Sequence, residues 1–333
     1  MNAIAARRKS IRARTFPAGH LGPRIRKVSS CCSPERAPAD PGVTSAPRPI
    51  PPDERAAGRL RRQAVTLPGG EFWMGSEDPD INAGDAESPV RQTTVAPFAI
   101  SPTTVTNAQF AAFAKAIGYR TTAEHLGWSY VFIGFVNPHA TTAIRGTHRS
   151  ATWWVGVDGA DWRHPEGTGS DIDRRPNHPV VHVSHHDAQA YCAWVGGRLP
   201  HEAEWEYAAR GGLDRARFPW GDDLVPDGRH RCNVWQGSFP HRNTGDDGWV
   251  GTCPVTTYRP NGFGLHNMVG NVWEWSLDRW APNGPENLYA MRGGSYLCHE
   301  SYCNRYRLAA RTANTEDSSS GNLGFRVIVN AST

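Results

Sequence analysis

Hydrophobic positions recur at helical spacing in three stretches of the chain. They predict helices over residues 106–118, 184–196 and 200–210. A threonine N-cap opens the first helix and a glycine closes it. The second begins after Ser184, with Asp187 in an approximate capping box. The third carries glutamates in its first turns, where carboxylates suit the helix dipole, and a glycine follows it.

The remaining pattern predicts short strands and much irregular backbone. Residues 65–75 read as strand, turn, strand, and residues 93–100 as a further strand. Beyond residue 212 the chain has few helical periods and is rich in Gly, Pro, Asn and Asp, yet it carries many tryptophans. An irregular backbone that carries so many aromatic side chains must be stabilised by something other than long runs of β-sheet hydrogen bonds. Bound metal ions are one physical means of doing so.

Composition narrows the class of protein. The 333 residues include 34 Gly and 26 Pro, which favours a loop-rich protein over a helical bundle. Length alone suggests about two domains, but no internal boundary is visible after residue 65. No run of about 18 apolar residues occurs, so no membrane-spanning helix is expected.

The first 64 residues differ from the rest in charge and in proline content. They hold 14 Lys/Arg against 4 Asp/Glu, nine prolines and no tryptophan, and we predict that residues 1–64 are disordered. The remainder is acidic, so the basic balance gives no reason to expect nucleic-acid binding. Arg7-Arg8 suggests an export signal, but no apolar segment follows it. A docking arm and an inert extension both remain open.

Seven cysteines, an odd number, exclude a complete disulfide framework within one chain. Cys298 and Cys303 lie five apart, just after Gly293-Gly294, where the backbone is free to adopt unusual conformations. From spacing alone this pair reads as two ordinary thiols, a local disulfide or a Cu(I) site. Zinc would need four ligands, and no fourth is obvious. Cys31 and Cys32 fall in the tail, where no structural role is expected.

Two later segments carry side-chain oxygens that would suit Ca²⁺. One contains Asn233 and Asp247, and the other Asn267 and Glu274. Neither has EF-hand spacing, so ordinary Asx turns are the alternative for both.

A series of short motifs runs through residues 65–330. They are Gly69-Gly70-Glu71-Phe72-Trp73-Met74-Gly75, Val105-Thr106-Asn107, Trp162-Arg163-His164-Pro165-Glu166-Gly167, Arg198-Leu199-Pro200-His201-Glu202-Ala203-Glu204-Trp205-Glu206-Tyr207, Phe218-Pro219-Trp220-Gly221, Asn271-Val272-Trp273-Glu274-Trp275 and Gly324-Phe325-Arg326. In this order they resemble the formylglycine-generating enzymes, or sulfatase-modifying factors. The strips 297–307 and 314–319 resemble the catalytic branch of that family.

The resemblance implies a single α+β domain over residues 65–330, with a C-type-lectin-like fold and little regular secondary structure. It implies a bacterial, cytoplasmic, copper-dependent oxidase, expected as a monomer. Its substrate would be a cysteine in a Cys-x-Pro-x-Arg motif of an unfolded sulfatase, which O₂ and a thiol reductant convert to formylglycine. A hydrogen leaves the substrate's β-carbon, and the resulting thioaldehyde hydrolyses.

The resemblance also assigns site residues. Cys298 and Cys303 would hold Cu(I), and Ser295, Tyr302 and Trp273 would line or adjoin the pocket. Two Ca²⁺ ions would be bound. The first would use the side chains of Asn233 and Asp247 with the carbonyls of Val234 and Trp249. The second would use the side chains of Asn267 and Glu274 with the carbonyls of Gly270 and Val272.

Two further readings within the superfamily stay open. One is a non-catalytic, lectin-like binding module, and the other an iron-dependent sulfoxide synthase. The second usually has an added helical domain, which this chain lacks room for. A disulfide of animal members is expected to be lost, because Val327 stands where Cys192 would find its partner. That loss fits a reducing compartment.

Overall fold

The computed structural model describes four stretches of the chain: residues 32–36, 49–82, 84–136 and 143–329. Residues 1–31 and 37–48, where disorder was predicted, lie outside them. Among the described residues no helix has both the length and the apolar character needed to cross a membrane.

All three predicted helices are present, and their caps explain their ends. They are α2 (Asn107–Ile117), α4 (His185–Trp194) and α5 (Glu202–Arg210). Thr106 and Ser184 each form a full capping box at the start of α2 and α4. Helix α5 begins two residues later than predicted, and α4 ends just before the glycine expected to stop it.

Two helices were not predicted. Helix α3 (Thr122–Leu126) is a single short turn held by its own capping box. Helix α1 (Glu54–Gln63) lies within the stretch predicted to be disordered, so the ordered domain begins before residue 65. Its N-cap Asp53 accepts a hydrogen bond from the Ala56 amide at 2.8 Å. Only its alanine face is buried, which is why the hydrophobic pattern did not reveal it.

The strands form two four-stranded sheets. The first has the order β1 (Val65–Leu67), β4 (Phe98–Ile100), β15 (Ile328–Val329) and β8 (Gly197–Arg198), and it joins the two ends of the domain. The second has the order β13 (Arg311–Thr315), β12 (Leu288–Arg292), β11 (Trp273–Arg279) and β14 (Leu323–Gly324). Strands β11 and β14 pair in parallel and the other neighbours are antiparallel.

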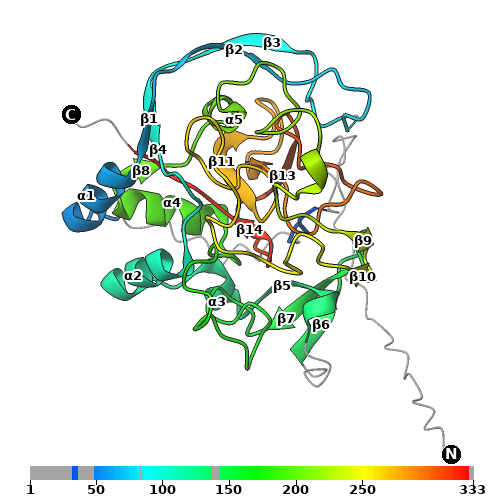
Figure 1. Ribbon diagram of the computed structural model, residues 1–333. Coiled ribbons are helices and arrows are strands. Elements are labelled where there is room, and N and C mark those ends of the chain that lie inside the picture. Colours follow the sequence, from blue (N-terminus) through cyan, green and yellow to red (C-terminus); the bar gives the residue numbers. More distant parts are fainter. Residues whose placement is uncertain (1–31, 37–48, 83, 137–142, 330–333) are drawn as a thin grey trace, which may run out of the picture.

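Smaller sheets complete the fold. A three-stranded sheet has the order β5 (Trp128–Phe132), β7 (Trp154–Asp158) and β6 (Ile144–Thr147). Two hairpins are formed by β2 (Gly70–Met74) with β3 (Arg91–Val95), and by β9 (Gly237–Ser238) with β10 (Arg242–Asn243). Single 3₁₀ turns cover Ile133–Phe135 and Pro226–Gly228. Helices α1, α2 and α4 gather on one side of the molecule, and the β5–β7–β6 sheet lies below the second four-stranded sheet (Figure 1).

Buried ion pairs hold much of the irregular backbone. Arg307 forms a two-pronged pair with Glu87, at 2.6 and 2.9 Å, with both side chains almost fully buried. Arg292 likewise contacts Glu206 at 2.5 Å in the interior. Such pairs tie loops far apart in sequence, because removing either partner would leave an uncompensated buried charge. These ion pairs therefore fix loops that the short β-strands do not hold by backbone hydrogen bonds.

Candidate functional site

The two cysteines predicted as metal ligands lie together just after strand β12. Gly293 and Gly294 leave this strand with φ of +94° and +74°, a region that side chains rarely adopt. A Cβ on Gly294 would lie 2.8 Å from the Arg305 carbonyl oxygen, so glycine lets the two limbs of this loop pack closely. The sulfurs of Cys298 and Cys303 lie 3.4 Å apart.

Both thiols are removed from water. Cys298 is 0% exposed and Cys303 is 1% exposed. Burial, reinforced by the neighbouring Cys303, raises the pKa of Cys298 well above its ordinary value. A thiolate here therefore needs a cation beside it, which a metal ion or a guanidinium can provide.

Ser295 lies against the Cys298 sulfur. Its backbone amide donates to that sulfur at 3.4 Å, and its Oγ lies 4.0 Å away. Asn322 fixes the serine hydroxyl, because its Nδ2 donates to Ser295 Oγ at 2.9 Å. The structure thus brings Ser295 to the cysteine pair, and it adds Asn322, which the sequence analysis did not single out.

Tyr302 and Trp273 make separate contacts in this region. The Tyr302 hydroxyl donates to the Leu297 carbonyl, and its ring stacks on Phe239 with centroids 4.0 Å apart. Trp273 is fully buried at the start of β11, and its amide donates to the Asn322 carbonyl at 2.8 Å. Tyr302 therefore forms part of an aromatic wall, whereas Trp273 supports the asparagine from within the core.

A short segment of the N-terminal tail occupies the same place. Residues 32–36 lie inside the molecule between β5 and β13, far from helix α1 (Figure 1). The Cys32 sulfur lies 2.8 Å from that of Cys303, and Cys32 is 2% exposed. The expectation that Cys32 has no structural role was wrong, because polar groups around the site bind this segment without any hydrophobic pattern.

The segment had a readable signal that the sequence analysis missed. Residues Cys32-Ser33-Pro34-Glu35-Arg36 have the spacing Cys-x-Pro-x-Arg. Arg305 was also missed: its Nη1 donates to the Cys32 sulfur at 3.3 Å. It lies in a strip already noted for its resemblance to the catalytic branch, but a basic residue there gave no specific indication of its role.

The first predicted calcium set is brought together. The Asp247 carboxylate accepts hydrogen bonds from the amides of Val234 (3.1 Å) and Trp249 (2.9 Å), and from Gln236 Nε2 (3.0 Å). Asn233 Oδ1 is buried and has no hydrogen-bond partner. Burial raises the pKa of Asp247, although these hydrogen bonds oppose the shift. An unpartnered amide oxygen beside a carboxylate without a paired lysine or arginine suits a hard cation.

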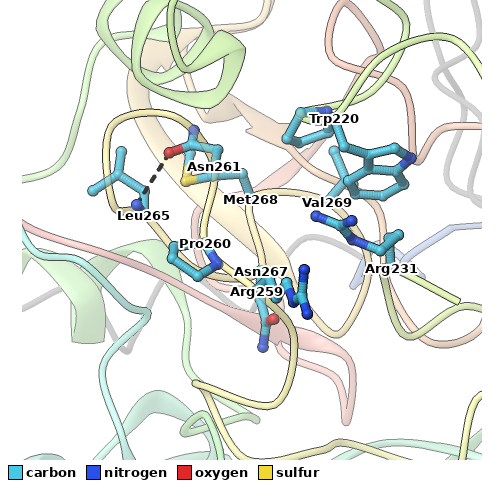
Figure 2. A pocket seen from close by; sticks show the side chains of 10 residues that line it. Trp220, Arg231, Arg259, Pro260, Asn261, Leu265, Asn267, Met268 and Val269 are labelled. Carbon is cyan, nitrogen blue, oxygen red and sulfur yellow. Dashed lines mark hydrogen bonds between the residues drawn. The ribbon is translucent and has the colours of Figure 1, made fainter. Parts of the chain in front are cut away.

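The second set fits less well. Asn267 Oδ1 is likewise buried without a partner. Glu274, however, already forms a two-pronged pair with Arg326 at 2.6 and 2.7 Å and accepts from Trp205 Nε1 at 2.8 Å. A cavity of about 10 Å³ beside Asn267 is lined by Arg231 and other residues (Figure 2). With the glutamate neutralised by arginine, the structure gives this set weaker support.

A second hollow lies elsewhere. It has a volume of about 450 Å³ and is lined by residues of hairpin β2–β3 and helix α5, including Phe72, Trp73 and Tyr207. Neither hollow is lined by Cys298 or Cys303. The tail segment fills the space beside the cysteines.

The chain matches the Sulfatase-modifying factor enzyme 1-like domain over residues 51–331, and it belongs to that family. It is 55% identical to a formylglycine-generating enzyme of Thermomonospora curvata, covering 82% of this chain and 95% of the relative. It is 54% identical to the enzyme of the same name from Streptomyces coelicolor, covering 87% and 95%. A Bos taurus relative named inactive Cα-formylglycine-generating enzyme 2 is 45% identical over 79% of this chain and 86% of its own.

Solved structures agree on the fold. The structure of PvdO from Pseudomonas aeruginosa superposes with a TM-score of 0.58 at 26% identity, covering 80% of this chain and 93% of PvdO. Together with the family match, this confirms the predicted single-domain, α+β architecture with short elements. The family match begins at residue 51, which agrees with the position of helix α1.

Proposed function

We propose that this chain is a formylglycine-generating enzyme that oxidises a cysteine of a sulfatase polypeptide to Cα-formylglycine. The observation that carries the proposal is the buried pair Cys298 and Cys303, with Ser295 and Asn322 fixed beside it. The names of the bacterial relatives, at up to 55% identity, support the same activity. The proposed substrate is an unfolded stretch with the motif Cys-x-Pro-x-Arg.

The proposed reaction consumes O₂ and a thiol reductant. The substrate –CH₂SH becomes –CHO, with its sulfur leaving as H₂S, and this oxidation releases two electrons. Two further electrons come from two reductant thiols, which become a disulfide. The four electrons reduce O₂ to two molecules of water. One molecule of water is used when the thioaldehyde hydrolyses to the aldehyde. One C–S bond breaks, one C=O bond forms, and one H₂O is the net water product.

Cys298 and Cys303 are the residues that would hold a copper(I) ion. Among the described parts of the chain, no group of three or more His, Cys, Asp or Glu side chains is arranged to hold a metal. The pair is thus a two-ligand set, and soft thiolates are the donors that Cu(I) prefers. Two ligands leave room for the substrate sulfur, and the metal would supply the reactivity toward O₂ that thiols alone lack.

The chain's own groups position the substrate and exclude water. Asn322 presents Nδ2 to a peptide carbonyl and holds the Ser295 hydroxyl toward the Cys298 sulfur. Arg305 keeps a positive charge beside the position of the substrate sulfur, which favours its thiolate form. The stacked rings of Tyr302 and Phe239 wall one side of the region.

We also propose that Ca²⁺ binds at Asn233 and Asp247, with the carbonyls of Val234 and Trp249 as further ligands. The unpartnered Asn233 oxygen and the uncompensated Asp247 carboxylate support this ion. Its role would be structural, since it would tie together a loop region of few ladders. A second ion at Asn267 has less support, for the reasons given above.

A direct experiment tests the oxidase. The copper-loaded protein is incubated with a Cys-x-Pro-x-Arg peptide, O₂ and a thiol reductant, and the aldehyde is captured with a hydrazide. We expect one O₂ consumed for each aldehyde formed. Cys303→Ser should abolish both Cu(I) binding and conversion, whereas Cys192→Ala, a buried cysteine outside the site, should retain both. Absence of aldehyde with folded, copper-loaded protein would refute the proposal.

A non-catalytic binding module is the second candidate, because one relative is named inactive despite 45% identity. It predicts that Cys298 and Cys303 can both be replaced without loss of peptide binding, and that no O₂ is consumed. An iron-dependent sulfoxide synthase would require Fe(II) in place of copper. Metal analysis of the active protein separates these readings.

A further inference from the structure

The tail segment at the site makes directed polar contacts along its length. The Cys32 carbonyl accepts from Asn322 Nδ2 at 2.8 Å. Asn314 Nδ2 donates to Ser33 Oγ at 2.9 Å and to the Pro34 carbonyl at 3.2 Å. Two asparagines, Asn314 and Asn322, therefore hydrogen-bond to three successive residues of the segment, Cys32 to Pro34.

The last residue of the segment has a pocket of its own. Arg36 is 4% exposed, and its guanidinium carbon lies 4.1 Å from the centre of the Trp128 ring. Its Nη2 donates to the Trp128 carbonyl and to Ser319 Oγ, both at 2.8 Å, and its amide donates to Ser318 Oγ at 2.9 Å. Burial lowers the pKa of Arg36 to about 10, opposed mainly by Asp317, so it stays charged at neutral pH.

Burial along the segment matches the fixed positions of the Cys-x-Pro-x-Arg motif. The buried positions are the cysteine, the serine, the proline and the arginine, whereas the side chain of Glu35 is exposed. Cysteine is directed at the Cys303 sulfur, and arginine enters the aromatic pocket. A segment that met the protein by chance would not bring its sulfur to the reactive pair and its only arginine to a cation–π site.

We propose that residues 32–36 are an intramolecular occupant of the substrate-peptide site, through which this chain restrains its own activity. The proposal rests on the proposed function for the identity of the competitor, a Cys-x-Pro-x-Arg sulfatase peptide. Because the segment belongs to the same chain, its local concentration is on the order of millimolar. An external peptide must displace it, so the apparent affinity for that peptide is reduced.

The fit of the segment is compatible with exchange. Arg36 Nε and Nη1 are buried without a hydrogen-bond partner. Each such unmet donor weakens the internal complex relative to an ideal ligand. An external peptide in excess therefore displaces the tail, and the restraint is reversible.

Binding to the full-length protein tests the proposal without relying on turnover. The probe is a fluorescein-labelled peptide in which serine replaces the cysteine of Cys-x-Pro-x-Arg, followed by anisotropy. Arg36→Ala should bind the probe about tenfold more tightly than the wild type. Glu35→Gln, which changes the exposed neighbour, should bind as the wild type does. Equal affinity of the wild type and Arg36→Ala would overturn the proposal.

A second measurement covers the case in which Arg36→Ala disturbs the fold. An unlabelled synthetic peptide of residues 28–40 is added in trans to Arg36→Lys, a milder change checked by its melting temperature. It should displace the probe competitively, and failure to displace it would contradict the shared site. Conversion of Cys32 itself to formylglycine in the wild type, by the same stoichiometry, would also support occupancy.

The two proposals fail in different ways. If Arg36→Ala binds the probe tightly but converts no cysteine peptide, the oxidase is refuted and the internal occupant stands. If the wild type and Arg36→Ala convert the cysteine peptide with the same KM and bind the probe equally, the oxidase stands and the internal occupant is refuted.

Discussion

Arg305 Nε lies 2.5 Å from Asp85 Oδ2, and both side chains are almost completely buried. The same guanidinium donates through Nη1 to the Cys32 sulfur at 3.3 Å. Burial alone would lower the pKa of Arg305, but Cys32, Asp85 and Cys303 together raise it. The ion pair therefore holds the Arg305 guanidinium beside the Cys32 sulfur, where we propose that the substrate sulfur binds.

Breaking this pair on one side should destabilise the protein strongly. Arg305→Ala leaves Asp85 buried without its cation, and we expect a loss of roughly 3–5 kcal/mol in the free energy of unfolding. The double variant Arg305→Met with Asp85→Asn removes both charges and should recover most of that loss. Urea denaturation measures both.

Activity separates the two roles of Arg305. The double variant should fold yet convert the sulfatase peptide poorly, because no cation faces the sulfur. Full activity in the stable double variant would show that Arg305 serves the fold alone.

A single amide nitrogen of Asn322 contacts both the tail segment and Ser295, the serine beside the Cys298 sulfur. Its Nδ2 donates to the Cys32 carbonyl at 2.8 Å and to Ser295 Oγ at 2.9 Å. Asn322→Ala leaves both acceptors without this donor, at a cost of about 1–3 kcal/mol. In the Arg36→Ala background, where the internal segment competes less, we expect KM for a Cys-x-Pro-x-Arg peptide to rise about tenfold. Ser301→Ala, at an exposed position near the site, should leave KM unchanged; a similar rise there would argue against a specific role for Asn322.

The helices were predictable because their signals are local. Thr106, Ser184 and Asp187 cap their helices through contacts three residues away, and the sequence shows both partners of each contact. The closeness of Cys298 and Cys303 was predictable for the same reason, since they lie five residues apart on one loop; their role as metal ligands rests on the family resemblance.

The rest depends on contacts between distant parts of the chain. Arg36 meets Ser318 and Ser319 across more than 280 residues, and no local pattern shows that a polar segment has such partners. Polar contacts of this kind bind the segment without hydrophobic residues, so composition alone suggested disorder. The Glu274–Arg326 pair is a similar case: the glutamate's position suggested a calcium ligand, and only the fold shows the arginine facing it.

Calcium at Asp247 should stabilise the protein measurably. A ligand present at 100 times its Kd raises the free energy of unfolding by about 2.7 kcal/mol, so a chelator should lower the melting temperature of the wild type. Asp247→Asn should melt at a lower temperature and respond less to the chelator, because the carboxylate is lost. Differential scanning fluorimetry with and without chelator measures this.

The neighbouring carboxylate provides the control for calcium. Asp246 is exposed, and Asp246→Asn should respond to the chelator as the wild type does. If the wild type shows no response to chelation, the calcium proposal fails; if Asp247→Asn responds fully, the ion is bound elsewhere.

His182 should make the fold sensitive to acid. It is completely buried, its Nε2 lies 2.8 Å from the Pro165 carbonyl oxygen and its Nδ1 lies 2.8 Å from Ser129 Oγ. In the neutral ring, Nε2 donates to this carbonyl. Burial lowers the pKa of His182 to about 4, although Glu166 opposes the shift.

The sign of the effect follows from the two pKa values. Between pH 6.5 and about 4 the unfolded chain holds a proton on this histidine that the folded chain does not, so the stability supplied by the neutral ring is lost as pH falls through that window. The loss is about 3 kcal/mol by pH 4. His182→Asn suits the positive φ of 58° here and cannot titrate, so its free energy of unfolding should fall less steeply with acidification. His186→Gln, at an exposed position, should follow the wild type, and parallel curves for His182→Asn and the wild type would contradict the prediction.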